Sequence, residues 1–259
     1  MRRALVTGAG QRLGRAMALY LGQRGFDVAV HYATSRVGAE ATADEIAAMG
    51  RRAVALQADL LDDAAAAALL PRAAEALGGP ITCLVNNASI FEYDDITSAT
   101  RESWDRHMGS NLRAPFVLTQ AMAGQGLKPG KDQNGEPRAA GLIVNMLDQR
   151  VRNLTPEFTT YTIAKMGLWA MTRSTAQALA PAIRVNGIGP GPTLKGSAQS
   201  TDDFAAQRRN TVLARGSNPE DITAALGYFI DSPGVTGQLI CTDGGEHLQW
   251  NTSPKGPLT

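Results

Sequence analysis

The sequence predicts an α/β fold of Rossmann type, with a doubly wound parallel sheet. Short apolar runs of strand type alternate with longer helical patterns along the chain. A glycine-rich turn directly follows the first of these runs. The 259 residues show no internal repeat and no second composition regime, so we expect one domain over 1–259 with a seven-stranded sheet.

Composition narrows the class of protein. Apolar residues make up 44 % of the chain, enough for a sizeable core, and the net charge of +1 gives no reason to expect nucleic acid as a partner. Cys83 and Cys241 lack metal-ligand spacing, so we expect neither a metal site nor a disulfide. No apolar run approaches the roughly 18 residues that span a bilayer, and no signal-peptide pattern precedes the first strand. We therefore expect a cytoplasmic protein without a membrane partner.

The N-terminal segment has the order strand, glycine-rich turn, helix. The strand covers 3–7, the turn GAGQRLG covers 8–14 and a helical run covers 15–24. Such glycines let the backbone approach a pyrophosphate, and the helix start offers free N–H groups and a positive dipole end. They also suit a tight turn without a ligand. In this context we interpret the turn as a dinucleotide-binding loop.

The end of the second predicted strand, 26–32, indicates which dinucleotide binds. Proteins that prefer NAD usually place Asp or Glu there to hold the ribose 2′-hydroxyl. Here His31, Tyr32, Ser35 and Arg36 occupy this region. Hydroxyl and guanidinium groups can bind a 2′-phosphate, and no carboxylate repels it. The sequence thus predicts NADP(H), while Ser35 and Arg36 equally suit the cap and first turn of the next helix.

The next elements are a helix over 40–49, a strand over 52–57 and an alanine-rich helix over 62–77. Pro71 is expected to kink or restart that last helix. Asp59, at the carboxyl end of the strand, either accepts a hydrogen bond from an adenine amino group or caps the helix.

The fourth strand, 81–85, runs into two asparagines that we expect to brace the sheet edge. Phe91 follows at the carboxyl end of the strand, where open α/β sheets bind ligands, although a packed aromatic is the alternative. The helical run 100–122 contains Asn111, a poor helix former that we expect to bend the helix or to hold a water.

The rest of the chain continues the alternation and adds two irregular segments. Segment 124–140 is rich in Gly, Pro and charge and indicates an exposed loop. Segment 193–215 follows the carboxyl end of a strand and is interpreted as a mobile lid over the substrate. The regular elements are expected as strands at 142–144, 182–188 and 238–242 and helices at 156–180 and 219–230.

Tyr161 and Lys165 lie four residues apart, on one face of the predicted helix 156–180. A nearby ammonium favours the phenolate and lowers the pKa of a tyrosine, which then exchanges protons near neutral pH. Alone, this pattern is also typical of solvated helix faces.

Taken together, the motifs resemble the short-chain dehydrogenases/reductases, in order and over nearly the whole chain. The matching residues are Thr7-Gly8 with Gly14, Asn86-Asn87-Ala88, Asn111, Tyr161 with Lys165, Arg184-Val185-Asn186 with Pro190-Gly191, and Asp243-Gly244-Gly245. The resemblance implies a nicotinamide cofactor and a homotetramer. It also implies that Tyr161 donates the proton, that Lys165 lowers its pKa and binds the nicotinamide ribose, and that Asn111 holds a water of the proton relay.

Two departures make the chain similar to the pteridine reductase branch of that family. Arg12 stands where the phosphate loop usually has glycine, and Asp148 stands at the position of the usual serine. By this resemblance Arg12 and Ser89 contact cofactor phosphate and substrate, and Phe91 stacks the pterin against the nicotinamide. The arginine that recognises the 2′-phosphate would align with Thr34, whereas here arginine occurs at Arg36.

The resemblance assigns three sets of site residues. The proposed catalytic residues are Asp148, Tyr161, Lys165 and Asn111. Cofactor contacts are expected from Gly8, Arg12, Leu13, His31, Tyr32, Ser35, Arg36, Asp59, Leu60, Asn87, Ala88, Ser89, Tyr161, Lys165, Pro190 and Gly191. Substrate contacts are expected from Arg12, Ser89, Phe91, Asp148 and Tyr161.

A carboxyl group beside the phenol suits the reduction of a C=N bond, because a ring nitrogen must be protonated there. A serine can hydrogen-bond a carbonyl but cannot carry that proton. Three functions stay open: an NADPH-dependent reductase of a pteridine (dihydropteridine or dihydrofolate type), a reductase of another substrate such as a 3-oxoacyl thioester, sugar or quinone, and a silent NADP(H)-binding protein. The intact set of Tyr161, Lys165 and Asn111 argues against the last.

Overall fold

The computed structural model describes residues 2–196 and 199–249. Its centre is a seven-stranded sheet in the order β3-β2-β1-β4-β7-β8-β9, with every neighbouring pair parallel. The order reverses between β1 and β4, as in doubly wound sheets. The fold class predicted from the sequence is therefore confirmed. The strands are β1 Arg3–Val6, β2 Asp27–Tyr32, β3 Ala53–Gln57, β4 Cys83–Asn86, β7 Gly141–Met146, β8 Ile183–Pro190 and β9 Leu239–Thr242.

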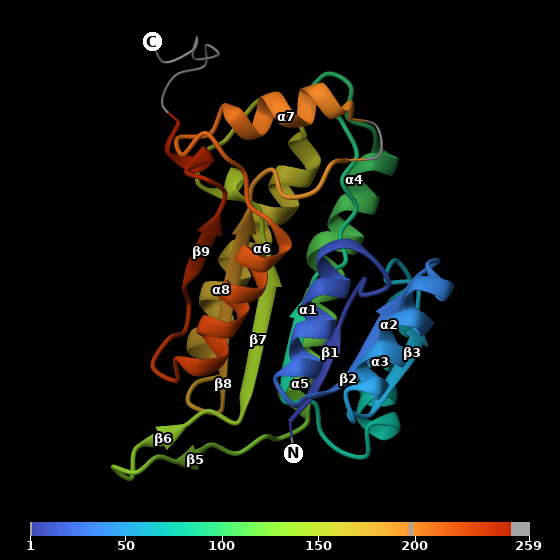
Figure 1. Ribbon diagram of the computed structural model, residues 1–259, viewed down its shortest axis with the longest axis vertical. Helices are drawn as coiled ribbons and strands as arrows, with labels where there is room; N and C mark the ends of the chain where they lie inside the picture. Colours follow the sequence, from blue (N-terminus) through green and yellow to red (C-terminus); the bar gives the residue numbers. More distant parts are fainter. Residues whose placement is uncertain (1, 197–198, 250–259) are drawn as a thin grey trace.

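Helices cover both faces of the sheet (Figure 1). Because successive side chains of a strand point to opposite faces, Val6 and Val144 pack into the core with α1, α2 and α8, whereas Leu5 and Ile143 pack into the core with α3 and α5. All four side chains are fully buried. The helices are α1 Arg12–Gln23, α2 Arg36–Ala48, α3 Asp63–Ala76, α4 Arg101–Met108, α5 Ala114–Gly124, α6 Thr159–Ala178, α7 Thr201–Arg209 and α8 Pro219–Asp231.

Several helix boundaries differ from the predicted ones. Helices α1 and α2 begin at Arg12 and Arg36, one turn earlier than expected. Pro71 neither divides nor restarts α3, which is continuous through it. Its ring lies on the exposed side of the helix, where the carbonyl oxygen that loses its donor is open to water.

Helix α6 begins at Thr159 and not at 156, since Phe158 adopts a left-handed backbone conformation with φ of 56°. That conformation cannot continue a right-handed helix toward the N-terminus. Tyr161 and Lys165 still fall within the helix and share one face, as predicted.

Asn111 lies in a π-helical turn, Gly109–Arg113, between α4 and α5. Its side-chain amide accepts a hydrogen bond from the backbone N–H of Ile90 at 2.9 Å and donates one to the carbonyl of Ile90 at 2.8 Å. The expected irregularity in this helical run is confirmed, and a widened turn of this kind is frequent at functional sites. That Asn111 also holds a water stays a prediction.

Segment 193–215 is more regular than expected, because it contains α7. Ser200 caps this helix by accepting a hydrogen bond from the N–H of Asp203 at 3.0 Å. The first turn of α7 contains two acidic residues and the last turn contains two arginines, which is the arrangement that the helix dipole favours. This charge pattern in the sequence already indicated a helix. Residues 197 and 198 of this segment lie outside the described part.

Segment 124–140 is exposed, as predicted, and contains a small antiparallel hairpin of β5 Gly130–Lys131 and β6 Pro137–Arg138. Figure 1 shows the hairpin at the end of the sheet where the strands begin, whereas α7 lies above the end where they finish. Within the described residues, no helix is both long and apolar enough to cross a bilayer.

Candidate active site

The glycine-rich loop after β1 packs so closely against its neighbours that a side chain at Gly14 would clash with them. Gly8 has a positive φ of 63°. A Cβ atom at Gly14 would lie 2.2 Å from the carbonyl oxygen of Gly8 and 2.5 Å from the amide nitrogen of Asn87. These contacts require glycine at position 14 and bring the loop close to the start of α1, where free backbone N–H groups can bind a pyrophosphate. The loop therefore fits the dinucleotide that the sequence predicts.

Arg12 occupies a left-handed conformation, with φ of 54°, inside this loop. Glycine adopts this conformation readily, whereas for arginine it costs about 1–2 kcal/mol of conformational energy. Its guanidinium donates hydrogen bonds to the carbonyl oxygens of Lys195 and Leu194, at 2.8 and 3.0 Å. Arg12 therefore joins the glycine-rich loop to segment 193–215.

His31 lies beneath the same loop and is 1 % exposed. Its Nδ1 accepts a hydrogen bond from the backbone N–H of Gly8 at 3.0 Å, and Nε2 lies 3.1 Å from the carbonyl oxygen of Ala58. These partners require the neutral tautomer with its proton on Nε2. Burial lowers the pKa of His31 from 6.5 to about 4. The imidazole thus holds the loop after β1 to the end of β3.

This histidine should make folding sensitive to mild acid. Its unfolded pKa is 6.5 and its folded pKa about 4, so between these values the unfolded state binds more protons. The free energy of unfolding should fall by about 3 kcal/mol as the pH drops from about 6.5 to about 4. Urea unfolding across this range, compared with His31→Gln, isolates the contribution, because glutamine can keep both hydrogen bonds without titrating. Parallel curves for the two proteins would contradict this prediction.

The end of β2 brings the proposed cofactor-selecting residues beside the loop. A Cβ atom at Gly10 would lie 2.5 Å from Oγ of Ser35, so that hydroxyl packs directly against the loop. Arg36 begins α2, is exposed, and pairs its Nε with Oε1 of Glu40 at 2.7 Å. Tyr32 is half-buried at the end of β2.

Asp59 does not cap α3, so that alternative is wrong. Asp62 caps it, by accepting hydrogen bonds from the N–H groups of Ala64 and Ala65 at 2.8 and 3.0 Å. Asp59 is exposed after β3 and accepts one hydrogen bond from the N–H of Leu61 at 2.9 Å. The adenine contact of Asp59 and Leu60 stays a prediction.

The two asparagines at the end of β4 brace the sheet edge, as expected. Asn87 donates its side-chain amide to the carbonyl oxygens of Thr7 and Gly8, at 2.8 and 3.2 Å. Asn86 donates to Oδ1 of Asn145 at 2.8 Å. The backbone N–H of Ala88 donates to Oγ1 of Thr7 at 2.9 Å. The carboxyl ends of β1, β4 and β7 are therefore cross-linked to one another.

Asp148 and Tyr161 form a direct pair. The phenol of Tyr161 donates to Oδ2 of Asp148 at 2.9 Å, and the backbone N–H of Arg150 donates to Oδ1 at 2.8 Å. Lys165 donates to the carbonyl oxygen of Met146 at 2.8 Å, and its Nζ lies 5.5 Å from the centroid of the Tyr161 ring. Tyr161 and Lys165 are buried. The structure thus brings the three predicted side chains together at the carboxyl end of β7.

Burial controls the electrostatics of this group. It raises the pKa of the Asp148 carboxyl and lowers the pKa of Lys165 to about 8. Burial and then the Asp148 carboxylate raise the pKa of Tyr161 well above its ordinary value of 10.0, although hydrogen bonding by Ser89 acts in the opposite direction. The predicted lowering of the tyrosine pKa by Lys165 was therefore wrong for this structure. The carboxylate contacts the phenol directly, whereas the ammonium faces a backbone carbonyl.

Phe91 belongs to an aromatic cluster with Tyr161 and with two residues that the sequence analysis did not single out, Phe158 and Tyr93. Its ring stacks on Phe158 with centroids 4.3 Å apart and lies edge-on to Tyr161 at 4.7 Å. Tyr93 contacts Phe158 edge-on at 5.3 Å, and the Arg150 guanidinium lies 4.9 Å from the Phe158 ring centroid. Phe91 remains 54 % exposed, so this cluster presents an aromatic surface beside the phenol.

Glu246 is a carboxyl side chain of this region that the sequence reasoning missed. A Cβ atom at Gly191 would lie 3.0 Å from its Oε2, and Gln207 donates to its Oε1 at 3.4 Å. Burial raises the pKa of Glu246. Asp243 fixes the turn before it by accepting a hydrogen bond from the N–H of Gly245 at 3.0 Å. Its position directly after Asp243-Gly244-Gly245 was the available signal.

The end of β8 contributes Pro190 and Gly191 to the same region. A Cβ atom at Gly191 would lie 2.7 Å from the Cβ of Asp243, so only glycine fits there. The backbone N–H of Gly191 donates to the carbonyl oxygen of Thr242 at 3.1 Å. Pro190 and Gly191 therefore lie close to the turn that carries Glu246.

Two further predicted contact residues lie elsewhere around the site. Ser89 is exposed beside Tyr161, and Leu13 is half-buried in the first turn of α1.

Comparison with known proteins identifies the family. A family model described as enoyl-(acyl carrier protein) reductase matches residues 8–247. The chain is 30 % identical over 250 residues to the 3-oxoacyl-[acyl-carrier-protein] reductase FabG of Staphylococcus aureus strain Mu50, covering 95 % of this chain and 98 % of that relative.

Solved structures agree in fold and in bound cofactor. FolM alternative dihydrofolate reductase 1 from Brucella suis, in complex with NADP, superposes with a TM-score of 0.89 at 40 % identity, covering 97 % of each chain. Angucycline C-6 ketoreductase LanV with bound NADP superposes with a TM-score of 0.85 at 30 % identity, covering 96 % of each chain. The chain therefore belongs to the short-chain dehydrogenase/reductase family and is an NADP-dependent oxidoreductase.

Proposed function

We propose that this enzyme reduces a pteridine, of dihydropteridine or dihydrofolate type, with NADPH. The observation that supports this best is the hydrogen bond between the Tyr161 phenol and the Asp148 carboxyl, in a place where burial raises the pKa of the carboxyl. A raised pKa favours the protonated form of a carboxyl group, and that form can protonate a ring nitrogen. The 40 % identity to FolM of Brucella suis, described as an alternative dihydrofolate reductase, points the same way.

In the proposed reaction, a C=N bond becomes a CH–NH unit. Bound NADPH supplies the hydride. Asp148 gives its proton to the ring nitrogen, and the carboxylate left behind is stabilised by the Tyr161 phenol at Oδ2 and by the N–H of Arg150 at Oδ1. Lys165 adds a positive charge near the new carboxylate. One proton and one hydride thus enter the substrate.

The aromatic cluster would bind the flat heterocycle. Phe158 packs against one face of Phe91, so we infer that the other face receives the pterin and holds it against the nicotinamide. Arg12 and Ser89 would contact the polar edge of the substrate and the cofactor phosphate. In this role Arg12 would also connect substrate binding to the position of Leu194 and Lys195.

A second candidate function is reduction of a 3-oxoacyl thioester or another ketone. Its support is the relative FabG of Staphylococcus aureus and the ketoreductase LanV. Purified enzyme with NADPH should be tested against dihydrobiopterin, dihydrofolate, acetoacetyl thioester and a quinone, by the loss of nicotinamide absorbance. Turnover of the thioester or quinone alone would overturn the pteridine proposal.

Arg36→Ala should weaken NADPH binding at least tenfold more than NADH binding, because only NADPH carries the 2′-phosphate that a guanidinium would contact. The Arg36–Glu40 pair is exposed, with Arg36 73 % exposed, so its loss should cost little stability. Fluorescence titration of both cofactors measures the two dissociation constants. Glu40→Ala serves as the control that breaks the pair and keeps the arginine. An equal loss for both cofactors would assign Arg36 to the helix surface alone.

We also propose a cytoplasmic homotetramer. Phe116 on α5 and Ile163 and Met166 on α6 are 41 %, 42 % and 38 % exposed, which favours an apolar packing surface on these helices. Light scattering after gel filtration measures the assembly state, and a monomer would contradict this proposal.

A further inference from the structure

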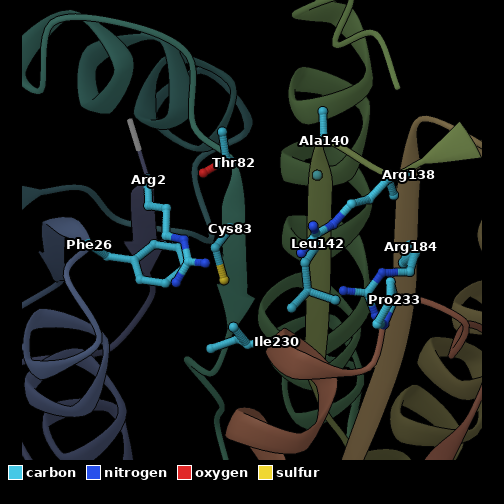
Figure 2. A pocket seen from close by; sticks show the side chains of 12 residues that line it. Arg2, Phe26, Thr82, Cys83, Arg138, Ala140, Leu142, Arg184, Ile230 and Pro233 are labelled. Carbon is cyan, nitrogen blue, oxygen red and sulfur yellow. The ribbon is translucent and has the colours of Figure 1, made fainter. Parts of the chain in front are cut away.

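A cavity of about 150 Å³ lies at the end of the sheet opposite to Tyr161. Cys83, Gly141 and Leu142, which line it, are among the first residues of β4 and β7, whereas the candidate active site lies at the carboxyl ends of the strands. Figure 2 shows Arg2, Arg138 and Arg184 around this space. None of these residues has a place in the proposed reaction.

The lining of this cavity is positively charged and has no compensating charge. No Asp or Glu is among its lining residues. Across residues 2–196 and 199–249, none of the three arginines forms an ion pair. Arg184 donates its Nη1 to the carbonyl oxygens of Ser232 and Val235, at 2.9 and 3.0 Å, so it is oriented by carbonyls and not by a carboxylate.

The three guanidinium groups come from distant parts of the chain. Arg2 precedes β1 and lies 5.5 Å from the ring centroid of Phe26, which also lines the cavity. Arg138 is held by the hairpin β5–β6, where it pairs with Gly130. Arg184 is the second residue of β8. The Gly- and Pro-rich segment 124–140 is not part of the candidate active site. Its hairpin places the Arg138 guanidinium at this cavity.

Arg184 is half-buried, whereas Arg2 and Arg138 are exposed. Like charges around one cavity repel each other unless an anion lies between them. Burial, and to a lesser degree the charge of Arg138, lower the pKa of Arg184. Guanidinium groups keep their charge throughout the physiological range and match the geometry of phosphate oxygens in paired hydrogen bonds. An anion in the cavity would therefore relieve the repulsion and satisfy free N–H donors.

We propose that this cavity is a second ligand site, which binds a phosphate group through Arg2, Arg138 and Arg184. Its size suits one phosphate group and not a second dinucleotide. The open side allows the phosphate to be free or to be the end of a phosphate monoester. Phe26 would then offer an apolar face to the remainder of that molecule.

The test titrates inorganic phosphate into the enzyme saturated with NADP⁺, so that the phosphate-binding groups of the cofactor site are already occupied. Calorimetry at constant ionic strength, with chloride as the balancing anion, should show saturable binding to one further site. Arg138→Gln should weaken this binding at least tenfold. Lys131→Gln, from the same hairpin but not from the cavity lining, should leave it within twofold.

Each outcome decides the proposal. Equal weakening in both variants, or binding that does not saturate, would show only general attraction of anions and overturn it. Unfolding temperatures without phosphate verify that Arg138→Gln is folded. Phenyl phosphate added to the same holoenzyme separates the two sources: tighter binding than inorganic phosphate assigns a monoester, and equal binding assigns free phosphate. Turnover of dihydropterin should be unchanged in Arg138→Gln, so failure here is independent of the proposed reaction.

Discussion

Replacing Asp148 by serine is expected to lower kcat for dihydropterin reduction by about a hundredfold or more, because general acid catalysis by a positioned group contributes about 10²–10⁴. A serine hydroxyl cannot give up the proton that the ring nitrogen needs. Asp148→Asn should lose a similar factor, since the amide keeps the shape of the carboxyl but carries no acidic proton. Steady-state kinetics with dihydrobiopterin and dihydrofolate measure both variants.

The controls for this prediction separate chemistry from folding and binding. The dissociation constant of NADPH should change less than twofold in both variants. Glu246→Gln removes another partly buried carboxyl of the same region. This variant should keep kcat within threefold, and any change should appear in KM. An unchanged kcat for dihydropterin reduction in Asp148→Ser would remove Asp148 from the mechanism.

Tyr161→Phe is expected to lower kcat by about a thousandfold, within the range for loss of a group that shares in proton transfer. The substitution removes one oxygen, the atom that donates to Oδ2 of Asp148 at 2.9 Å. Without this hydrogen bond the carboxylate left after proton transfer loses a charge-assisted donor in a buried place, where such bonds are strongest. Steady-state kinetics with a dihydropterin measure the loss in kcat, and a direct binding measurement shows whether the affinity for NADPH has also changed.

Tyr93→Phe is the matched control for that substitution. Tyr93 belongs to the same aromatic cluster, through its edge-on contact with Phe158, but forms no hydrogen bond to Asp148 among the described residues. It should keep kcat within about threefold. If Tyr161→Phe lost no more activity than Tyr93→Phe, the phenol would have only a packing role.

Local patterns in the chain were sufficient for part of this site. The spacing of Tyr161 and Lys165 places both on one face of a helix wherever that helix begins, because helical periodicity depends only on neighbouring residues. The glycines of the loop after β1 were readable for the same reason: their conformation is set within a few residues. The start of α6 was not readable, since it depends on the left-handed conformation of Phe158.

Contacts between distant segments could not be read in this way. Phe91 and Phe158 come from different βα connections, and nothing local to either residue indicates that their rings stack. Glu246 reaches the site only because β9 pairs with β8 and brings the following turn beside Gly191. The direction of the Tyr161 pKa was mispredicted because it depends on burial and on the Asp148 contact, both of which are properties of the folded chain.

The sequence alone determined the alternation of the seven sheet strands with most of the helices, the parallel sheet, the phosphate loop and the residue types available for proton transfer, because each of these is encoded in short-range periodicity and turn chemistry. Only the tertiary structure decided that the Asp148 carboxyl faces the Tyr161 phenol, that aromatic rings from two connections form one surface, and that three arginines line one cavity at the opposite end of the sheet. Those arrangements depend on which strands lie side by side and on how much water the fold excludes, and neither is a property of any single stretch of the chain.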